Sequence, residues 1–246
     1  MKHIFYRMAA IAAIFLSASA TQAAIIDFEQ PIDSSYAQSE QFFGNGDEFY
    51  QSGYYFNTFS NDPDAWPGDL VGAMIIGGDS DMCSGLVCPT NNPTSFYGAL
   101  NDSVMAFGRL DGQSFAVNGF DASFIGAEGA SLPAVSGLLR LQGFTSSGTY
   151  LTQTYQLAGP NVAGALGFGS YQTSGAFAST MFESVYAFGF SCNSAGSCGA
   201  FSSNKAQFAL DNLSVTAVPE PETTAMFALG LLAMGAAVRR RRQQSV

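Results

Sequence analysis

The sequence predicts an all-β fold, a single β-sandwich or jelly-roll-like domain over residues 24–217. Three observations lead to this prediction. Charged residues make up only 11% of the chain, aromatic residues reach 13%, and short runs with alternating apolar and polar residues recur along it. Gly, Asn, Ser and Pro interrupt these runs about every ten residues. A chain of 246 residues accommodates one such domain with a short segment at each end.

The alternating runs define nine candidate strands, a number typical of a sandwich. The clearest hairpin joins 138–144 to 150–155 across the polar, glycine-containing turn 145–149. The stretch 42–93 is the least regular and is therefore the expected region of functional loops. The candidate strands are 25–29, 53–59, 71–76, 103–107, 115–124, 137–144, 150–157, 185–191 and 206–216.

The first 23 residues have the order of a secretory signal peptide. A basic start, 1–7, precedes an apolar run, 8–16, and then a series of small residues. The apolar run is shorter than a transmembrane helix requires. We expect signal peptidase to cut after Ala23, the alternative being Ala20, so that the exported domain begins near residue 24.

The expected exported domain is strongly acidic. Between Asp27 and Asp211 the chain holds 17 acidic residues against three basic ones, which gives a net charge of −14. Such a surface repels phosphate backbones and anionic lipids, so nucleic acid is excluded as a partner. Cation binding at acidic loops fits this charge, although solubility alone accounts for most of the acids.

The four cysteines form two close pairs in a chain bound for an oxidising compartment. Of the three connectivities, we favour the local one, because the residues between Cys83 and Cys88 and between Cys192 and Cys198 are typical of loops. A zinc site is the alternative. It is disfavoured because neither spacing is that of a zinc knuckle and the exported domain has no histidine.

The absence of histidine also limits catalysis. His3 is the only histidine and leaves with the signal peptide. Hydrolases that use a histidine base are therefore excluded, and we assign no catalytic residue. Paired carboxylates remain available for glycoside hydrolysis, but nothing in the sequence selects a pair among the scattered acids.

The sole tryptophan, Trp66, lies in the irregular region beside Asp62 and Asp64. An aromatic ring next to acids is a common way to hold a sugar or a cation. Trp66 could instead cap the core, and we favour the core position because buried tryptophans outnumber displayed ones. These three residues are the candidate ligand loop.

Residues 218–246 contain three parts in a defined order. A Pro-Glu motif precedes an uncharged segment, 223–238, which would form a helix of ~24 Å, just long enough to span a membrane. The arginine run that follows would stay on the cytoplasmic side. The sorting and processing residues are Val218, Pro219, Glu220, Pro221, Arg239, Arg240, Arg241 and Arg242.

This tail resembles the PEP-CTERM sorting signal, and 207–211, with its Gln-Phe and following Asp, is similar to the QFxxD subgroup. The resemblance implies recognition by an exosortase in bacteria that make exopolysaccharide. It also implies a precursor held transiently in the inner membrane and a mature protein at the cell surface or in the extracellular matrix. An ordinary C-terminal anchor helix, the alternative, leaves the Pro-Glu motif unexplained.

The layout also resembles jelly-roll carbohydrate-binding modules, which commonly hold a structural calcium between their first and last strands. In this chain the resemblance maps the ligands onto Glu29 and Asp211. Calcium needs six to eight oxygens, so backbone carbonyls would have to complete the site. The alternative is that Asp211 serves a turn or accepts backbone amide hydrogen bonds.

Our primary hypothesis is an exported, non-catalytic sandwich with a structural or exopolysaccharide-associated role. A carbohydrate-binding module is the alternative if Trp66 is exposed on a groove. A glycosidase is the third hypothesis, if two buried carboxyls face each other across a cleft.

Overall fold

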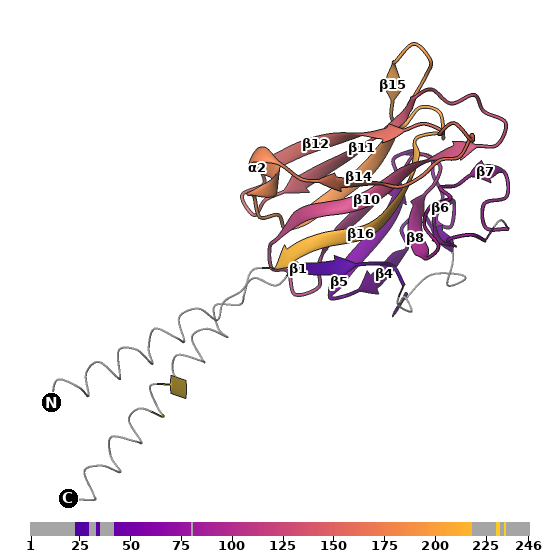
Figure 1. Ribbon diagram of the computed structural model, residues 1–246. Coiled ribbons are helices and arrows are strands. Elements are labelled where there is room, and N and C mark those ends of the chain that lie inside the picture. The colour runs from indigo at the N-terminus through magenta and orange to yellow at the C-terminus, as the bar shows by residue number, and fades with distance from the viewer. Residues whose placement is uncertain are drawn as a thin grey trace, which may run out of the picture. The chain divides into compact units, whose positions relative to one another are not determined.

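The chain folds into two antiparallel β-sheets packed face to face (Figure 1), so the predicted all-β sandwich is confirmed. The computed structural model describes residues 23–29, 33–34, 42–79 and 81–217, together with 230, 231 and 234. Residues 23–216 form one compact unit. Within the described residues, helix is limited to one short turn, α2 (Gly175–Ala178), and to the isolated positions near 230.

The first sheet, sheet A, takes its strands from both ends and the middle of the domain. β1 pairs with β16, so that Ala23 lies opposite Thr216, and β7 (Leu86–Val87) pairs with β10. The order across the sheet is β13 (Gly169–Gln172), β10 (Phe115–Ala127), β16 (Gln207–Ala217), β8 (Ser95–Ala99), β6 (Leu70–Ile76) and β3 (Phe42–Gly44), with β1 (Ala23–Ile26) beside β16.

The second sheet, sheet B, contains the predicted hairpin. Its strands β11 and β12 pair from Phe144 opposite Tyr150 outward, in the register expected from the turn. β15 (Cys198–Gly199) extends β14 at one end. The order is β12 (Tyr150–Ala158), β11 (Val135–Phe144), β14 (Ser184–Cys192), β9 (Ser103–Arg109), β5 (Tyr54–Ser60), β4 (Glu48–Gln51) and β2 (Asp33–Ser34).

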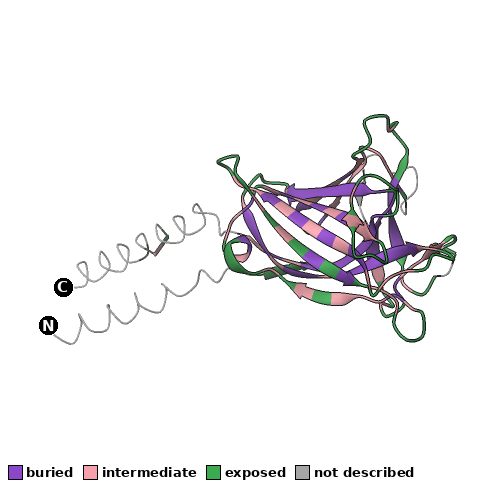
Figure 2. Cartoon of the chain, turned by 90° about the horizontal axis from the view of Figure 1, so that it is seen from above, coloured by how far each residue is buried: buried purple, intermediate pink, exposed green. Residues whose placement is uncertain are grey.

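The main core lies between the sheets and is rich in aromatic rings. Alternate residues of β5 and β11 are buried, which produces the stripes visible along the strands in Figure 2. Phe43 stacks on Phe49 at 4.7 Å between ring centroids, and Phe49 stacks on Phe56 at 4.8 Å. These stacked rings contribute both apolar burial and favourable ring geometry.

A second, smaller core covers the outer face of sheet A. Ile75, Phe96 and Ile125 are buried there beneath the segment 77–94. Asn91 holds this segment down: its side chain donates to the Phe168 carbonyl at 3.1 Å and accepts from the Phe168 amide at 2.7 Å. The central strands of sheet A are therefore buried on both faces, which explains why β6 is a continuous apolar run.

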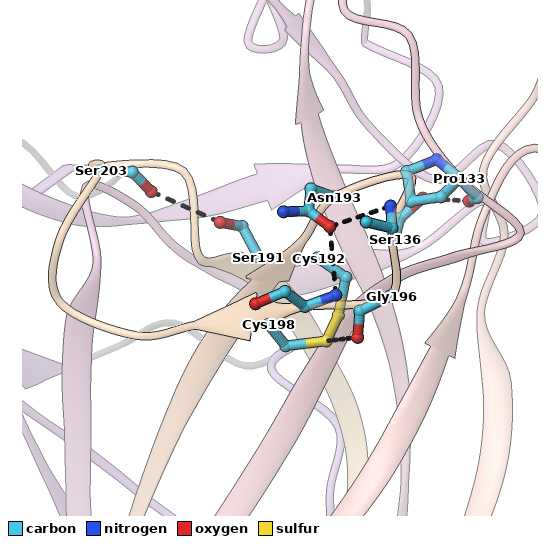
Figure 3. The surroundings of a disulfide bond; sticks show 10 residues. Pro133, Ser136, Ser191, Cys192, Asn193, Gly196, Cys198 and Ser203 are labelled. Atoms are coloured by element: carbon cyan, nitrogen blue, oxygen red, sulfur yellow. Dashed lines mark hydrogen bonds between the residues drawn. A yellow bond between two sulfur atoms is a disulfide. The ribbon is translucent and has the colours of Figure 1, made fainter.

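Both local disulfides are formed, Cys83–Cys88 in the segment over sheet A and Cys192–Cys198 at the end of β14. Figure 3 shows the second one closing a tight turn. Within that turn the Asn193 side-chain oxygen accepts the backbone amides of Ala195 and Ser197 at 3.0 and 3.1 Å. The loop is therefore held by hydrogen bonds as well as by the covalent link.

All nine predicted strands are present, with ends shifted by a few residues. The largest difference is at the start, where β1 ends at Ile26 and the predicted strand continued to Glu29. Phe28 has a φ of 56°, which turns the chain out of the sheet while its ring enters the core. The short strands β2, β3, β4, β7, β8, β13 and β15 were not predicted.

Candidate functional site

The Trp66 loop, residues 61–69, connects β5 of sheet B to β6 of sheet A. Asn45, in the turn between β3 and β4, supports it from one side. The Asn45 side chain accepts the Ser60 amide at 2.9 Å and donates to the Trp66 carbonyl at 3.4 Å, and its backbone amide donates to the Asp69 carbonyl at 2.8 Å. One asparagine thus fixes both ends of the loop.

The acids of the loop serve its turns. The Asp62 carboxylate accepts the Asp64 amide at 2.9 Å, and the Asp69 carboxylate accepts the Trp66 amide at 2.8 Å. Such contacts are the usual role of Asp in turns. Asp62, Asp64 and Asp69 are all exposed, so they also give the loop a negative surface.

Trp66 is 75% exposed, so the expectation that it caps the core is wrong. The reason is that the adjoining core is already filled by the stacked Phe43, Phe49 and Phe56 rings. The loop crosses from one sheet to the other at their edge, where its side chains project away from the interior. An exposed indole held on a hydrogen-bonded loop is a suitable platform for a flat ligand.

A depression of about 440 Å³ adjoins the loop. Its apolar part includes Phe42 and Leu70, which are 44% and 41% exposed, and its polar part includes Asn45 and Asp47. Exposed apolar groups beside fixed polar ones are typical of small-ligand sites. The lining residues are Phe42, Phe43, Gly44, Asn45, Gly46, Asp47, Pro67, Gly68 and Leu70.

A second depression, of about 610 Å³, lies where the segment 77–94 meets β10. The disulfide Cys83–Cys88 forms part of its wall, and two exposed carboxylates, Asp79 and Glu128, lie at it. The Asp79 carboxylate accepts the Asp81 amide at 2.9 Å and so also serves a turn.

Glu29 lies beyond the end of β1, but its charge still acts on the Asp211 carboxylate. Asp211 is 1% exposed, and burial raises its pKa to about 6, with smaller increases from the nearby charges of Glu29 and Asp121. Hydrogen bonds from Asn212 and Asn92 act in the opposite direction. Acids from two distant parts of the chain thus influence one buried carboxylate.

Both oxygens of the Asp211 carboxylate already accept hydrogen bonds. The Asn212 backbone amide donates at 2.7 Å, and the Asn92 side-chain amide donates at 2.6 Å. This arrangement matches the alternative in which Asp211 bonds amide groups. Within the part of the chain that the structure describes, no three His, Cys, Asp or Glu residues cluster at ligand distance. Calcium at Glu29 and Asp211 stays a prediction.

The residues assigned to sorting, Val218 to Pro221 and Arg239 to Arg242, lie outside the described residues, as does the signal peptide up to Gln22. Among the residues that are described, no helix has the length and apolar character to cross a membrane.

Comparison with known proteins identifies the tail. The PEP-CTERM protein-sorting motif matches residues 217–242, so the chain is a PEP-CTERM domain-containing protein. The motif indicates export and implies processing by an exosortase. The match covers the tail alone and leaves the sandwich unassigned. No curated protein matches the chain.

Several solved structures are similar to this chain. One is TmCBM61 in complex with β-1,4-galactotriose, at 7% identity and a TM-score of 0.31, covering 65% of this chain and 86% of that one. Another is the CBM22-1 xylan-binding domain of Xyn10C from Paenibacillus barcinonensis, at 9% identity and a TM-score of 0.29, covering 82% and 98%. With TM-scores below 0.5, these similarities carry no conclusion about this chain.

The sequence interpretation missed a third surface, the outer face of sheet B. Aromatic residues of β5, β11 and β14 alternate with buried ones and so point away from the core. The signal was present in the period-two pattern of these strands. It could not be interpreted because alternation does not show whether the outward residues of different strands lie on a shared surface.

Proposed function

We propose that this protein is an exported, non-catalytic β-sandwich that reaches the cell surface or extracellular matrix through its sorting tail and binds polysaccharide there through the Trp66 loop. The observation that carries the proposal is the 75% exposure of Trp66 on a loop fixed by hydrogen bonds. A large apolar ring displayed to water in a fixed position has a cost that a ligand stacked on it would offset.

The depression next to the loop supports a hydroxylated ligand. Phe42 and Leu70 supply apolar surface, while Asn45 and Asp47 supply polar groups at fixed positions. Sugars present both an apolar ring face and a hydroxyl rim. The acidic charge of the domain favours an uncharged or cationic polymer over an acidic one.

A carboxylate-based glycosidase is less well supported. Among the described residues the buried carboxyls are those of Asp102 and Asp211. Asp102 accepts the backbone amides of Ser202, Ser203 and Ala206, and Asp211 accepts amide hydrogen bonds from Asn92 and Asn212. Both groups are committed to structure, whereas a catalytic pair would face a substrate across a cleft.

The test is a glycan array combined with a hydrolysis screen, using wild-type protein and Trp66→Ala. We expect wild type to bind at least one neutral glycan and Trp66→Ala to lose that binding. Because Trp66 is exposed, the Trp66→Ala variant should keep the melting temperature of the wild-type protein. Unchanged binding by the variant would remove the loop from the site, and release of sugar products would replace the proposal with the glycosidase.

A further inference from the structure

The outer face of sheet B carries a layer of aromatic rings between β4 and β12. The residues that alternate with them, such as Phe49, Phe56 and Ala187, are fully buried in the core, so these rings point to the other side. We call this surface the aromatic face. Its rings are Tyr50, Tyr55, Phe59, Phe144, Tyr150, Tyr186, Phe188 and Phe190.

Four of the rings form a connected row across the strands. Phe59 contacts Tyr186 at 6.1 Å between centroids, Tyr186 contacts Phe144 at 5.1 Å, and Phe144 contacts Tyr150 at 5.9 Å. This row leads from β5 to the edge strand β12. At ~4.8 Å between neighbouring strands, four steps correspond to roughly 19 Å, the reach of an extended ligand rather than a single small molecule.

Small residues on β9 allow the row to close. The outward positions of β9 are Val104, Ala106 and Gly108, and they lie between β5 and β14 in the register. A Cβ on Gly108 would lie 2.6 Å from the Tyr55 hydroxyl, so glycine is needed there. The rings of the neighbouring strands therefore meet above β9.

Polar groups are held in place among these rings. The Glu48 carboxylate accepts the Tyr50 hydroxyl at 3.0 Å and the Asn57 side-chain amide at 3.1 Å. On the other side, the Arg140 guanidinium donates to Thr154 at 2.9 Å and lies 4.8 Å above the Phe190 ring. Hydrogen-bonding groups in fixed positions between ring faces match a hydroxylated ring compound.

The local charge distinguishes this face from the rest of the domain. Among its outward positions on β4, β5, β9, β14, β11 and β12, the charged residues are Glu48 and Arg140, which cancel. The domain as a whole has a net charge of −14. An anionic polymer would be repelled by the domain, and two copies of it would repel each other. An uncharged ligand meets neither obstacle.

We propose that the aromatic face is a second polysaccharide-binding surface, for an extended, uncharged chain lying across the strands. This second surface rests on the proposed function but consists of residues other than those of the Trp66 loop. Binding at each of the two sites can therefore be tested separately. If both sites bind, one domain holds two chains and cross-links them, which is a structural role in a polysaccharide matrix.

The test is affinity electrophoresis of the purified exported protein in gels containing hydroxyethyl cellulose, β-1,4-galactan or glucomannan, with alginate as the anionic polymer. The variants are Tyr150→Ala and Asn57→Ser on the aromatic face, and Trp66→Ala on the loop. Tyr150 is 60% exposed, so its removal should leave the melting temperature unchanged. Ile25→Ala, at an exposed apolar position of β1 on the outer face of sheet A, is the matched control.

We expect retardation in at least one neutral gel, a roughly tenfold weaker affinity for Tyr150→Ala and Asn57→Ser, and wild-type behaviour for Ile25→Ala. If Trp66→Ala alone weakens binding, the aromatic face is overturned and the loop stands. If the face variants alone weaken binding, the loop fails and the face stands. Retardation in alginate alone, or in no gel, overturns both sites. A concentration-dependent dimer lost in Tyr150→Arg would make a second copy the occupant.

Discussion

Replacing Asp211 with asparagine tests whether a buried carboxylate makes this domain more stable in mild acid. Asp211 is 1% exposed, and burial, assisted by Glu29 and Asp121, raises its pKa from 3.8 to about 6. The folded state therefore binds the proton more tightly than the unfolded state. Stability should rise as the pH falls through 6, and the destabilising contribution of the charge should be fully present above pH 6.

The size of the effect follows from the pKa shift. A shift of about two pH units, at ~1.4 kcal/mol per unit, corresponds to about 3 kcal/mol as an upper bound. For a domain of this length, each kcal/mol moves the melting temperature by roughly 2–4 °C. Asp211→Asn is uncharged at every pH and should lose this dependence. It also loses one accepted hydrogen bond, from Asn92 or Asn212, which is a pH-independent cost of ~1 kcal/mol.

The assay is a series of thermal melts between pH 4 and pH 8 in chelator, for wild type, Asp211→Asn and Asp62→Asn. Asp62→Asn removes the same charge from an exposed turn and should keep the wild-type pH dependence. If Asp211→Asn also keeps the wild-type pH dependence, the buried carboxylate is not the cause of that dependence. Repeating the melts with calcium tests the predicted ion. A higher melting temperature with calcium in wild type, but not in Asp211→Asn, would support the site at Glu29 and Asp211. An unchanged melting temperature in wild type would rule that site out.

Three further predictions concern the loops and the ends. Asp102→Ala should lower the free energy of unfolding in urea by about 2–4 kcal/mol, because three backbone amides lose their acceptor; a smaller loss would mean that water replaces the carboxylate. The double serine variant of Cys192 and Cys198 should lose about 2 kcal/mol, and unchanged stability would show that the hydrogen-bonded turn suffices. Mass spectrometry of secreted protein should show both ends removed, with the second cut near 219–221; extracellular chains that retain 239–242 would contradict exosortase processing.

Eight of the nine predicted strands have seven or more residues, and they were predictable because alternation and turn residues are properties of neighbouring positions. The strands that were missed, such as β3 (Phe42–Gly44) and β8 (Ser95–Ala99), have two to five residues, too few to show a period. They exist because distant partners supply the hydrogen bonds, as when β8 pairs with both β6 and β16. No local pattern records such partners.

The candidate site shows the same division. The Trp66 loop was identified from its composition, but the position of the indole depended on whether the neighbouring core had space for it. Phe43, Phe49 and Phe56 fill that core from three strands, which leaves Trp66 in solvent. Asp211 likewise was identified by its place in the last strand. The hydrogen bond that its carboxylate accepts from Asn92, 119 residues away, depended on the fold.

The sequence by itself determined the all-β class, the nine predicted strands, the local disulfide pairing and the sorting tail, because each depends on residue types at short spacing. Only the tertiary structure decided which side chains share a surface. The contact of Phe59 with Tyr186 and the placement of Glu48 between Tyr50 and Asn57 come from the strand order and register. Register is set by packing over the whole sandwich, so residues far apart in the chain become neighbours on one face.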